Sequence, residues 1–324
     1  MQLTMVPAAA PQHLDRGKWH NPLISIVVTH HDYSDHLPDA LLSLLDQTHQ
    51  NWECVVVDDG SDDGHRLAAE TIVMKMKEPR IRFIARENGG QIPAFFTGLD
   101  ATTGEFVCLL DPDDRYDETF LAEMADAHLG EAVFTPIACC EQRIVHNGTQ
   151  ITGVYSTLPI EFLEKDARTG RAVVPPTVVH QTLWIGPHVE GWHWTSTSAM
   201  MFRRAALDVM RPHRELGYRG SADSYLAQGA HVLGGTLRLT RPLIYRVAHA
   251  DNAWLSDGIW ASTQNKRKPG GSEESRRCLV DVIEAIKANG ADHQLRKAEK
   301  GKPLTRWKRS IVKRWRKLTG TRHG

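Results

Sequence analysis

Short apolar runs and helical repeats alternate along the first half of the chain. The runs are rich in β-branched residues and read as buried strands, at residues 24–31, 53–57, 81–85 and 106–110. Leucines recur at helical spacing between residues 37 and 45, and further helices are predicted over 67–76 and 90–101. This alternation predicts an α/β fold with a mainly parallel sheet and right-handed crossovers.

The alternation stops in the second half. A helix is expected from near Glu118 and a strand over 132–137, and the pattern around His146-Asn147-Gly148 predicts a β-hairpin over 143–155. A last helix is predicted over 272–288. Its expected apolar face consists of Leu279, Ile283 and Ile286.

With 324 residues and 41% hydrophobic content, the chain can bury a large core in one domain or two. Its five cysteines have no metal-like spacing, so we expect reduced core thiols in a cytosolic protein. No apolar run approaches the length of a membrane span, and residues 1–21 lack the features of a signal peptide. We expect those residues to form a flexible arm.

A net charge of zero hides two oppositely charged parts. Residues 296–324 contain twelve Lys and Arg against Glu299, a net of +11, which leaves 27 basic and 38 acidic residues, a net of −11, in the rest. Apolar residues recur in this tail at steps of three and four, at Leu304, Trp307, Ile311, Trp315 and Leu318. This pattern predicts a basic amphipathic helix that lies on an anionic membrane surface. Docking of the helix on the acidic body is the alternative; nucleic-acid binding is disfavoured because no reader motif accompanies the charge.

Acidic residues follow two of the predicted strands. Asp58 and Asp59 follow one, and Asp111, Asp113 and Asp114 follow another. The carboxyl ends of parallel strands meet at one sheet edge, where ligands bind, and carboxylates gathered there predict a divalent cation such as Mg²⁺ or Mn²⁺. An Asp-rich turn that only caps the next helix is the alternative for the second cluster.

The opening strand, the Asp58-Asp59-Gly60-Ser61 turn and the Asp-x-Asp motif together resemble the inverting family 2 glycosyltransferases of the GT-A fold, from about Pro22 to Asn252. The resemblance implies a Rossmann-like sheet with a nucleotide-sugar-binding half over 22–137 and an acceptor-binding half over 138–252. A loop and C-terminal helix over 253–295 and the basic tail would follow. The implied substrates are a nucleoside-diphosphate-sugar, with a UDP-sugar expected, and a glycan or lipid-linked acceptor. The implied cofactor is Mn²⁺ or Mg²⁺.

The resemblance also places the donor site. Thr29 and His31 would flank the base and Asp59 would bind its edge, while Asp58 resembles a structural residue of the turn. The piece from Asn88 through Gly90 to Gly98 resembles a glycine-rich element that approaches the donor, although Phe96 stands where relatives have Asn. Ordinary helix–strand packing is the alternative for these glycines. The full donor set carried over is Thr29, His31, Asp58, Asp59, Asn88, Gly90, Asp111 and Asp114.

Metal and catalytic roles follow in the same way. Asp113 would be the central metal ligand, with Asp111 and with His249 of the piece Tyr245-Arg246-Val247-Ala248-His249; a surface histidine is the alternative. Asp223 would be the catalytic base, because it matches the Asp of a Glu-Asp-x-x-Leu piece whose Glu is Ala222 here. An ordinary Asp at a helix start is the alternative.

Residues 156–195 contain Trp184, Trp192 and Trp194, which would stack on acceptor sugars, cover a lipid carrier or belong to the core. A basic loop over 265–272 would close over the donor phosphates.

Two other classes of function remain as alternatives. A sugar nucleotidyltransferase is disfavoured because residues 29–32 lack a glycine-rich basic loop; a non-catalytic binding module is mildly favoured by Phe96 and Ala222. Synthesis of a cell-surface polysaccharide or glycolipid, by an enzyme on the inner face of the cell membrane, is the expectation.

Overall fold

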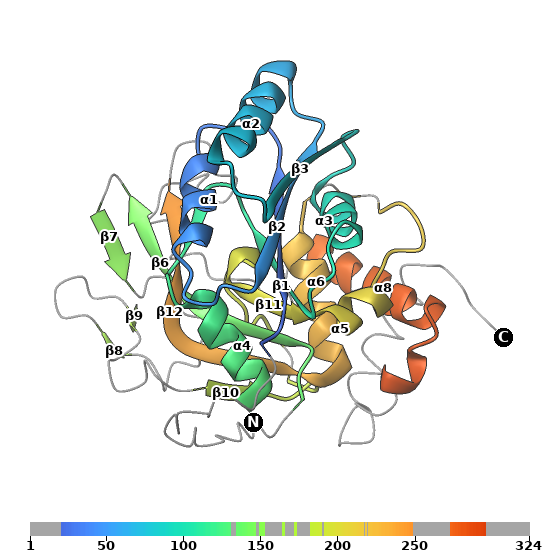
Figure 1. The fold of residues 1–324 in the computed structure, drawn as a ribbon. Coiled ribbons are helices and arrows are strands. Elements are labelled where there is room, and N and C mark those ends of the chain that lie inside the picture. Colours follow the sequence, from blue (N-terminus) through green and yellow to red (C-terminus); the bar gives the residue numbers. More distant parts are fainter. Residues whose placement is uncertain are drawn as a thin grey trace.

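The computed structural model describes residues 21–130, 134–146, 149–152, 164–165, 172–173, 182–189, 191–216, 218, 220–248 and 273–295. Its first half has the predicted alternation (Figure 1). The elements are β1 (Ile24–His30), α1 (Leu37–Leu45), β2 (Trp52–Asp59), α2 (Asp63–Met76), β3 (Ile81–Arg86), α3 (Gln91–Asp100) and β4 (Phe106–Leu110). Helix α2 begins four residues earlier than expected because the Asp62 carboxylate accepts a hydrogen bond from the His65 N–H at 2.8 Å and caps the helix.

The second half extends the same sheet. Its remaining helices and strands are β5 (Asp114–Tyr116), α4 (Phe120–Gly130), β6 (Ile137–His146), β7 (Thr149–Thr152), β8 (Glu164–Lys165), β9 (Ala172–Val173), β10 (Thr182–Ile185), η3 (Thr197–Ala199), β11 (Met200–Arg203), α5 (Arg204–Val209), α6 (Ala222–Gly234), β12 (Thr236–Ala248) and α8 (Glu273–Ala288). The main sheet has the order β10-β12-β6-β11-β4-β1-β2-β3, with β5 on β12 and β7 on β6.

Neighbours are parallel in the β4-β1-β2-β3 part and in the β6–β12 pair, while β11 runs antiparallel between β6 and β4. The predicted mixed, mainly parallel sheet with flanking helices is therefore confirmed. Because β11 joins the two parallel parts, residues from both halves of the chain reach the same sheet edge.

Helices cover both faces of the sheet. Helices α1, α2 and α4 contribute to one buried cluster, and α3, α5, α6 and α8 contribute to the other. Strand β1 feeds both clusters, since Ile26 and Val28 face one and Val27 faces the other. Burial on both faces explains why these strands are continuous apolar runs.

The structure differs from one strand predicted in the second half and agrees with the predicted hairpin. The strand predicted over 132–137 is wrong: Phe134, Thr135 and Pro136 lie outside strands, and β6 begins only at Ile137. Pro136 cannot donate to a strand ladder, and the exposed Phe134 ring packs under the Arg203 guanidinium at 4.2 Å. The hairpin is confirmed, because β6 and β7 pair with His146 opposite Thr149.

The apolar face predicted for the last helix is partly wrong. Helix α8 buries Cys278, Val282, Ala285 and Ile286, whereas Ile283 is only half-buried. All five cysteines are buried and free of disulfides, as expected. None of the helices within the described ranges has the length and apolar character that a membrane crossing requires.

Candidate active site

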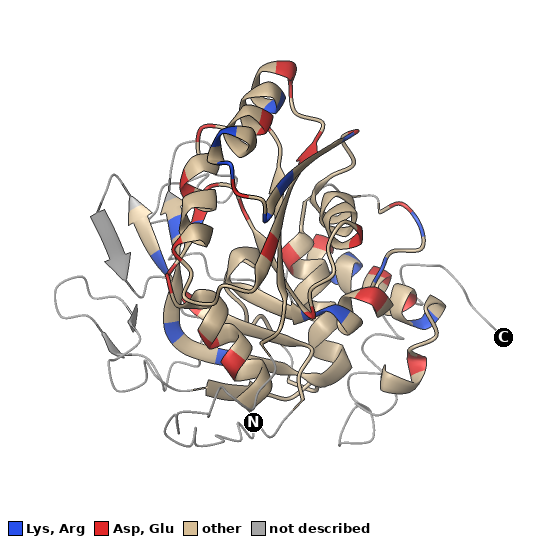
Figure 2. Cartoon of the chain, in the orientation of Figure 1, with Lys and Arg blue, Asp and Glu red and all other residues tan. Residues whose placement is uncertain are grey.

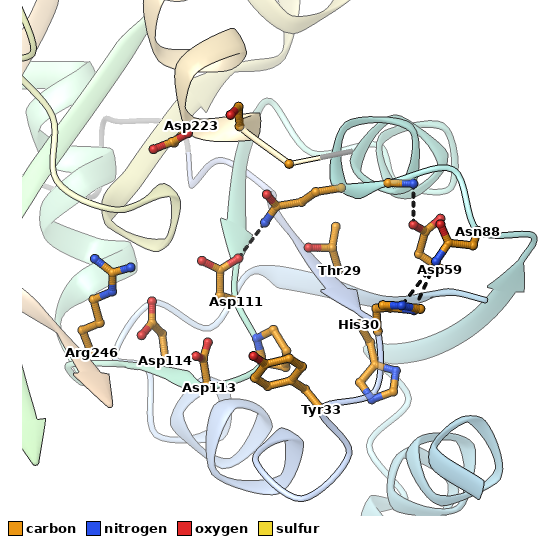
Figure 3. Close-up of a pocket in the computed structure, with 16 residues that line it drawn as sticks. Thr29, His30, Tyr33, Asp59, Asn88, Asp111, Asp113, Asp114, Asp223 and Arg246 are labelled. Carbon is orange, nitrogen blue, oxygen red and sulfur yellow. Dashed lines mark hydrogen bonds between the residues drawn. The ribbon is translucent and has the colours of Figure 1, made fainter. Parts of the chain in front are cut away.

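A cavity of about 570 Å³ opens at the carboxyl ends of β1, β2 and β4 (Figure 3). Its lining includes nine residues that the sequence predicted for the site: Thr29, His31, Asp59, Asn88, Gly90, Asp111, Asp113, Asp114 and Asp223. The parallel register explains the convergence, because Thr29, Asp59 and Asp111 all end or follow adjacent strands.

The two ends of the cavity differ in charge. Figure 3 shows Asp111, Asp113, Asp114, Asp223 and Arg246 at one end, whereas Asp59 and Asn88 lie at the other. Arg246 reaches the acids because β12 pairs with β5, which places it opposite Asp114 in the register. One basic side chain thus stands among four carboxylates.

Burial and mutual repulsion raise the pKa of two of these acids. Burial, followed by the repulsion of Asp113, raises the pKa of the Asp111 carboxyl to about 7, while Arg246 acts in the opposite direction. The same causes raise the pKa of Asp114 well above its ordinary value. Asp111 Oδ1 accepts a hydrogen bond from Gln91 Nε2 at 2.9 Å, but Asp114 Oδ2 is buried without a hydrogen-bond partner.

These residues fit a divalent cation that is shared with a ligand. The donors are carboxylate oxygens, one of them an unpartnered buried atom, and a cation would offset the repulsion among them. Among the residues that the structure describes, no three His, Cys, Asp or Glu side chains could hold a metal ion by themselves. A cation here would therefore need oxygens from the ligand, as Mg²⁺ takes from phosphates.

At the other end, Asp59 organises the loop before α3. Its carboxylate accepts hydrogen bonds from Arg86 Nη1 at 2.7 Å, from the Gly89 N–H at 3.0 Å and from the Gly90 N–H at 2.6 Å. A carboxylate has about four lone-pair sites. Asp59 therefore keeps little capacity for the edge of a base and acts first on the loop.

Asp58 does not line the cavity but lies behind it. It is fully buried and accepts hydrogen bonds from His30 Nδ1 at 2.8 Å and from the Ser61 N–H at 3.2 Å. Burial lowers the pKa of the His30 imidazole, while the hydrogen bond to Asp58 acts in the opposite direction. Asp58 thus holds β1 and the turn after β2 together, and it would reach a donor only through its neighbours.

Two glycines have different roles. Gly98 is a packing residue, because a Cβ there would lie 2.4 Å from Val27 Cγ1. Gly90 has φ = +95° at the start of α3 and lines the cavity, so it serves the backbone turn that presents its N–H to Asp59. Phe96 is buried in the core. Its side chain carries no polar group, so this position offers a donor no hydrogen bond.

Asp223 lies in the first turn of α6 and faces the other acids across the cavity (Figure 3). Its Oδ1 accepts a hydrogen bond from the Ser224 N–H at 2.6 Å, and its charge raises the pKa of Asp111. The residue is thus both an Asp at a helix start and a carboxylate directed at the cavity.

The tryptophans belong mainly to the core. Trp194 is buried and its Nε1–H donates to Thr236 Oγ1 at 3.1 Å, and Trp192 packs edge-on against it with ring centroids 5.3 Å apart. Trp184 packs against the core cluster of α1, α2 and α4.

Seven residues of the cavity lining were not among those predicted for the site: His30, Tyr33, Gln91, Pro112, Gly220, Ser221 and Arg246. Gln91 follows directly after Gly90, and Arg246 lies three residues before the predicted ligand His249, so their neighbourhood in known motifs was a usable signal. His249, the basic loop over 265–272 and the tail over 296–324 lie outside the described residues.

Residues 25–177 match the model of the family described as "Glycosyl transferase family 2". An uncharacterised glycosyltransferase of Nostoc sp. is 27% identical over 263 residues, which cover 81% of this chain and 76% of that protein. Residues 25–177 of this chain therefore belong to glycosyltransferase family 2. A putative teichuronic acid biosynthesis glycosyltransferase of Bacillus subtilis, TuaG, is 31% identical over 106 residues, 32% of this chain and 41% of TuaG.

Solved structures give the same fold. S. aureus TarS 1-349 in complex with UDP aligns with a TM-score of 0.53 and 17% identity, over 84% of this chain and 68% of that one. The same protein in complex with UDP-GlcNAc aligns with a TM-score of 0.52 and 17% identity, over 84% and 69% of the two chains. At this identity the likeness concerns the fold of the glycosyltransferase, a mixed sheet flanked by helices.

Proposed function

We propose that this family 2 glycosyltransferase moves a sugar from a nucleoside-diphosphate-sugar, in particular a UDP-sugar, to a glycan or lipid-linked acceptor with inversion. The observation that carries the proposal is the position of Asp223. It enters the cavity from α6, opposite the acids that follow β4, so a donor bound at the acids would be approached by an acceptor from the side of Asp223. The UDP in the TarS complex supports the choice of donor.

Different residues of the chain would bind the donor and assist the transfer. The ends of β1 and β2 would bind the nucleoside, and Arg246 would face the negative charge of the diphosphate. Asp223 would accept the proton of the attacking acceptor hydroxyl while the bond from the anomeric carbon to the diphosphate breaks. One displacement without a covalent intermediate inverts the configuration at that carbon.

A divalent cation, Mn²⁺ or Mg²⁺, would be held by Asp113 and Asp111 together with the donor phosphates, and when bound it would neutralise the departing diphosphate. Asp114, which is buried and lies opposite Arg246 in the register, would close the inner side of the metal site. His249 remains a proposed further ligand.

The acceptor and the location are also proposals. The putative role of TuaG in teichuronic acid biosynthesis supports a polymer of the cell surface as the product. A lipid-linked acceptor would place the enzyme at the inner face of the cell membrane, as a peripheral protein.

The deciding experiment is a screen of nucleotide-sugars with the full chain in Mn²⁺ or Mg²⁺, with release of the nucleoside diphosphate as the readout. We expect slow release from one donor class, abolished by EDTA. Binding of a donor without any release, even with candidate acceptors, would favour the non-catalytic module instead. Release of pyrophosphate from a nucleoside triphosphate and a sugar phosphate would favour the nucleotidyltransferase.

A further inference from the structure

Helix α8 lies against α6, the helix whose first turn carries Asp223. The two helices touch closely, because a Cβ at Gly229 of α6 would lie 2.4 Å from Val282 Cγ2 of α8. Gln228 Nε2 of α6 also donates to the Ser275 carbonyl of α8 at 3.0 Å. Both helices lie beyond residues 25–177, the part that matches the family model. Helix α8 thus helps to hold the helix of the proposed base in place.

The residue before α6 has a strained backbone. Ser221 has φ = +63° and ψ = +29°, the left-handed region that side chains with a Cβ seldom adopt. Its carbonyl accepts the Tyr225 N–H at 3.0 Å and so begins the helix, two residues before Asp223. Such a conformation persists only where surrounding contacts hold it.

Helix α8 supplies the contact that holds Ser221. The Ser221 hydroxyl donates to Glu274 Oε1 at 2.6 Å. Glu274 stands in the first turn of α8. Ala222, the next residue of α6, is buried and its side chain offers Ser221 no hydrogen bond.

We propose that Glu274 is a positioning residue for sugar transfer. Through the Ser221 hydroxyl it holds the first turn of α6 in the conformation that directs Asp223 into the cavity. Without this bond the strained Ser221 relaxes and Asp223 is displaced, whereas the nucleoside and diphosphate positions on β1, β2 and β4 keep their geometry. The inference rests on the proposed role of Asp223 as the base.

The test compares Glu274→Ala with Glu274→Gln in the full chain. In Glu274→Ala we expect kcat to fall by roughly 10- to 100-fold, as for a catalytic group misplaced by about an ångström, with unchanged affinity for UDP in Mn²⁺. Glu274→Gln should restore kcat, because its amide oxygen accepts the same hydrogen bond. Asp281→Ala is the matched control: it removes another α8 carboxylate, bonded to Arg214 Nη2 at 2.6 Å, without touching Ser221.

Equal losses in Glu274→Ala and Asp281→Ala would overturn the proposal, since general docking of α8 would explain both. So would a Glu274→Gln variant as slow as Glu274→Ala. Ser221→Ala should match Glu274→Ala, and the double variant should be no worse than either, because both changes remove one bond.

Hydrogen exchange gives a readout that does not need activity. The amides of residues 221–226 should exchange faster in Glu274→Ala than in the wild type, and at the wild-type rate in Glu274→Gln. If the wild-type chain releases no nucleoside diphosphate from any donor, the proposed function fails, and faster exchange would then leave Glu274 only a structural role. If these amides exchange at the wild-type rate in Glu274→Ala, the Ser221–Glu274 hydrogen bond does not hold the first turn of α6, and the proposal is wrong.

Discussion

Asp111, Asp113 and Asp114 follow one buried strand, but the fold gives each carboxylate different surroundings. Asp114 is buried and pairs in register with Arg246, and Asp111 is anchored on both sides, with its N–H donating to Ser198 Oγ at 3.1 Å and its carboxylate accepting from Gln91. Asp113 lies between these two in the sequence, and its charge raises the pKa of both. It is therefore the carboxylate whose negative charge a cation would use most directly.

Asp113→Asn keeps the side-chain shape and removes this charge. We expect the metal-dependent transfer rate to fall by at least about 10- to 100-fold, the loss found even for outer partners of metal ligands. The measurement is the transfer rate as a function of Mn²⁺ concentration. Asp117→Asn is the control, because Asp117 pairs with Arg143 at 3.0 Å and lies outside the cavity lining. Near-normal transfer by Asp113→Asn would show that the ligand assignment is wrong.

Asp223→Asn should separate catalysis from binding. The amide oxygen of Asn can accept the same Ser224 N–H, so the first turn of α6 is expected to remain folded. Loss of a general base lowers the rate by about 10²–10⁴-fold. Affinity for the nucleoside diphosphate should stay near the wild-type value, measured by calorimetry in Mn²⁺. A joint loss of rate and affinity would instead indicate a structural acid.

The sequence predicted the acids of this site but not their partners. Asp59, Asp111 and Asp113 could be found because strand ends are visible as apolar runs that stop at polar residues. Ser221 could not, since only the packing of α6 brings it to the cavity. Arg246 had only the weaker signal of a neighbouring motif, because its position depends on the long-range pairing of β12 with β5. Gln91 is an intermediate case, since it follows a motif but has no motif role of its own.

At the scale of elements, the strands buried on both faces were the easiest to predict. Strands β1, β2 and β4 are continuous apolar runs bounded by polar turns. Strand β12 was not predicted, because it contains Arg238, Arg241 and Pro242 and its register with β6 shifts between Arg238 and Pro242. Arg238 is fully buried and paired with Glu141. From the residue types alone, both side chains would be expected at the surface.

The fit of α3 against β1 can be tested at Gly98. In Gly98→Ala the new Cβ would lie 2.4 Å from Val27 Cγ1, so the helix must shift, and we expect a loss of about 1–3 kcal/mol in the free energy of unfolding. Gly64→Ala is the control, because its Cβ would meet only Asp62 Oδ1 at 3.3 Å in an exposed helix. Urea denaturation measures both.

The second variant Val27→Ala decides whether the clash is the cause. It removes the two methyl groups that the new Cβ would meet, so Gly98→Ala should cost much less in its presence. Full additivity of the two changes would contradict the packing explanation and would point to a loss of backbone freedom at position 98.

At the scale of the whole molecule, charge is divided along the chain. Figure 2 shows acidic and basic positions interspersed over the described helices and strands. The excess of +11 lies in residues 296–324, beyond the described part, and the compensating −11 belongs to the residues before it. An anionic membrane and the chain's own acidic body offer this tail the same kind of attraction, because both carry negative charge.

Sedimentation with liposomes separates the two. The full chain should sediment with anionic vesicles but not with neutral ones. Each Lys or Arg near an anionic surface contributes about 1 kcal/mol to the binding free energy, and the apolar stripe enters the membrane interface. A chain that ends at Lys302 should bind neither, yet keep its transfer rate on a soluble acceptor. Replacing Trp307 and Trp315 by Ser leaves every charge in place, so a membrane helix should lose much of its binding, whereas simple charge attraction should not change. Equal partitioning of the full and shortened chains would refute membrane binding by the tail and would favour docking on the acidic body.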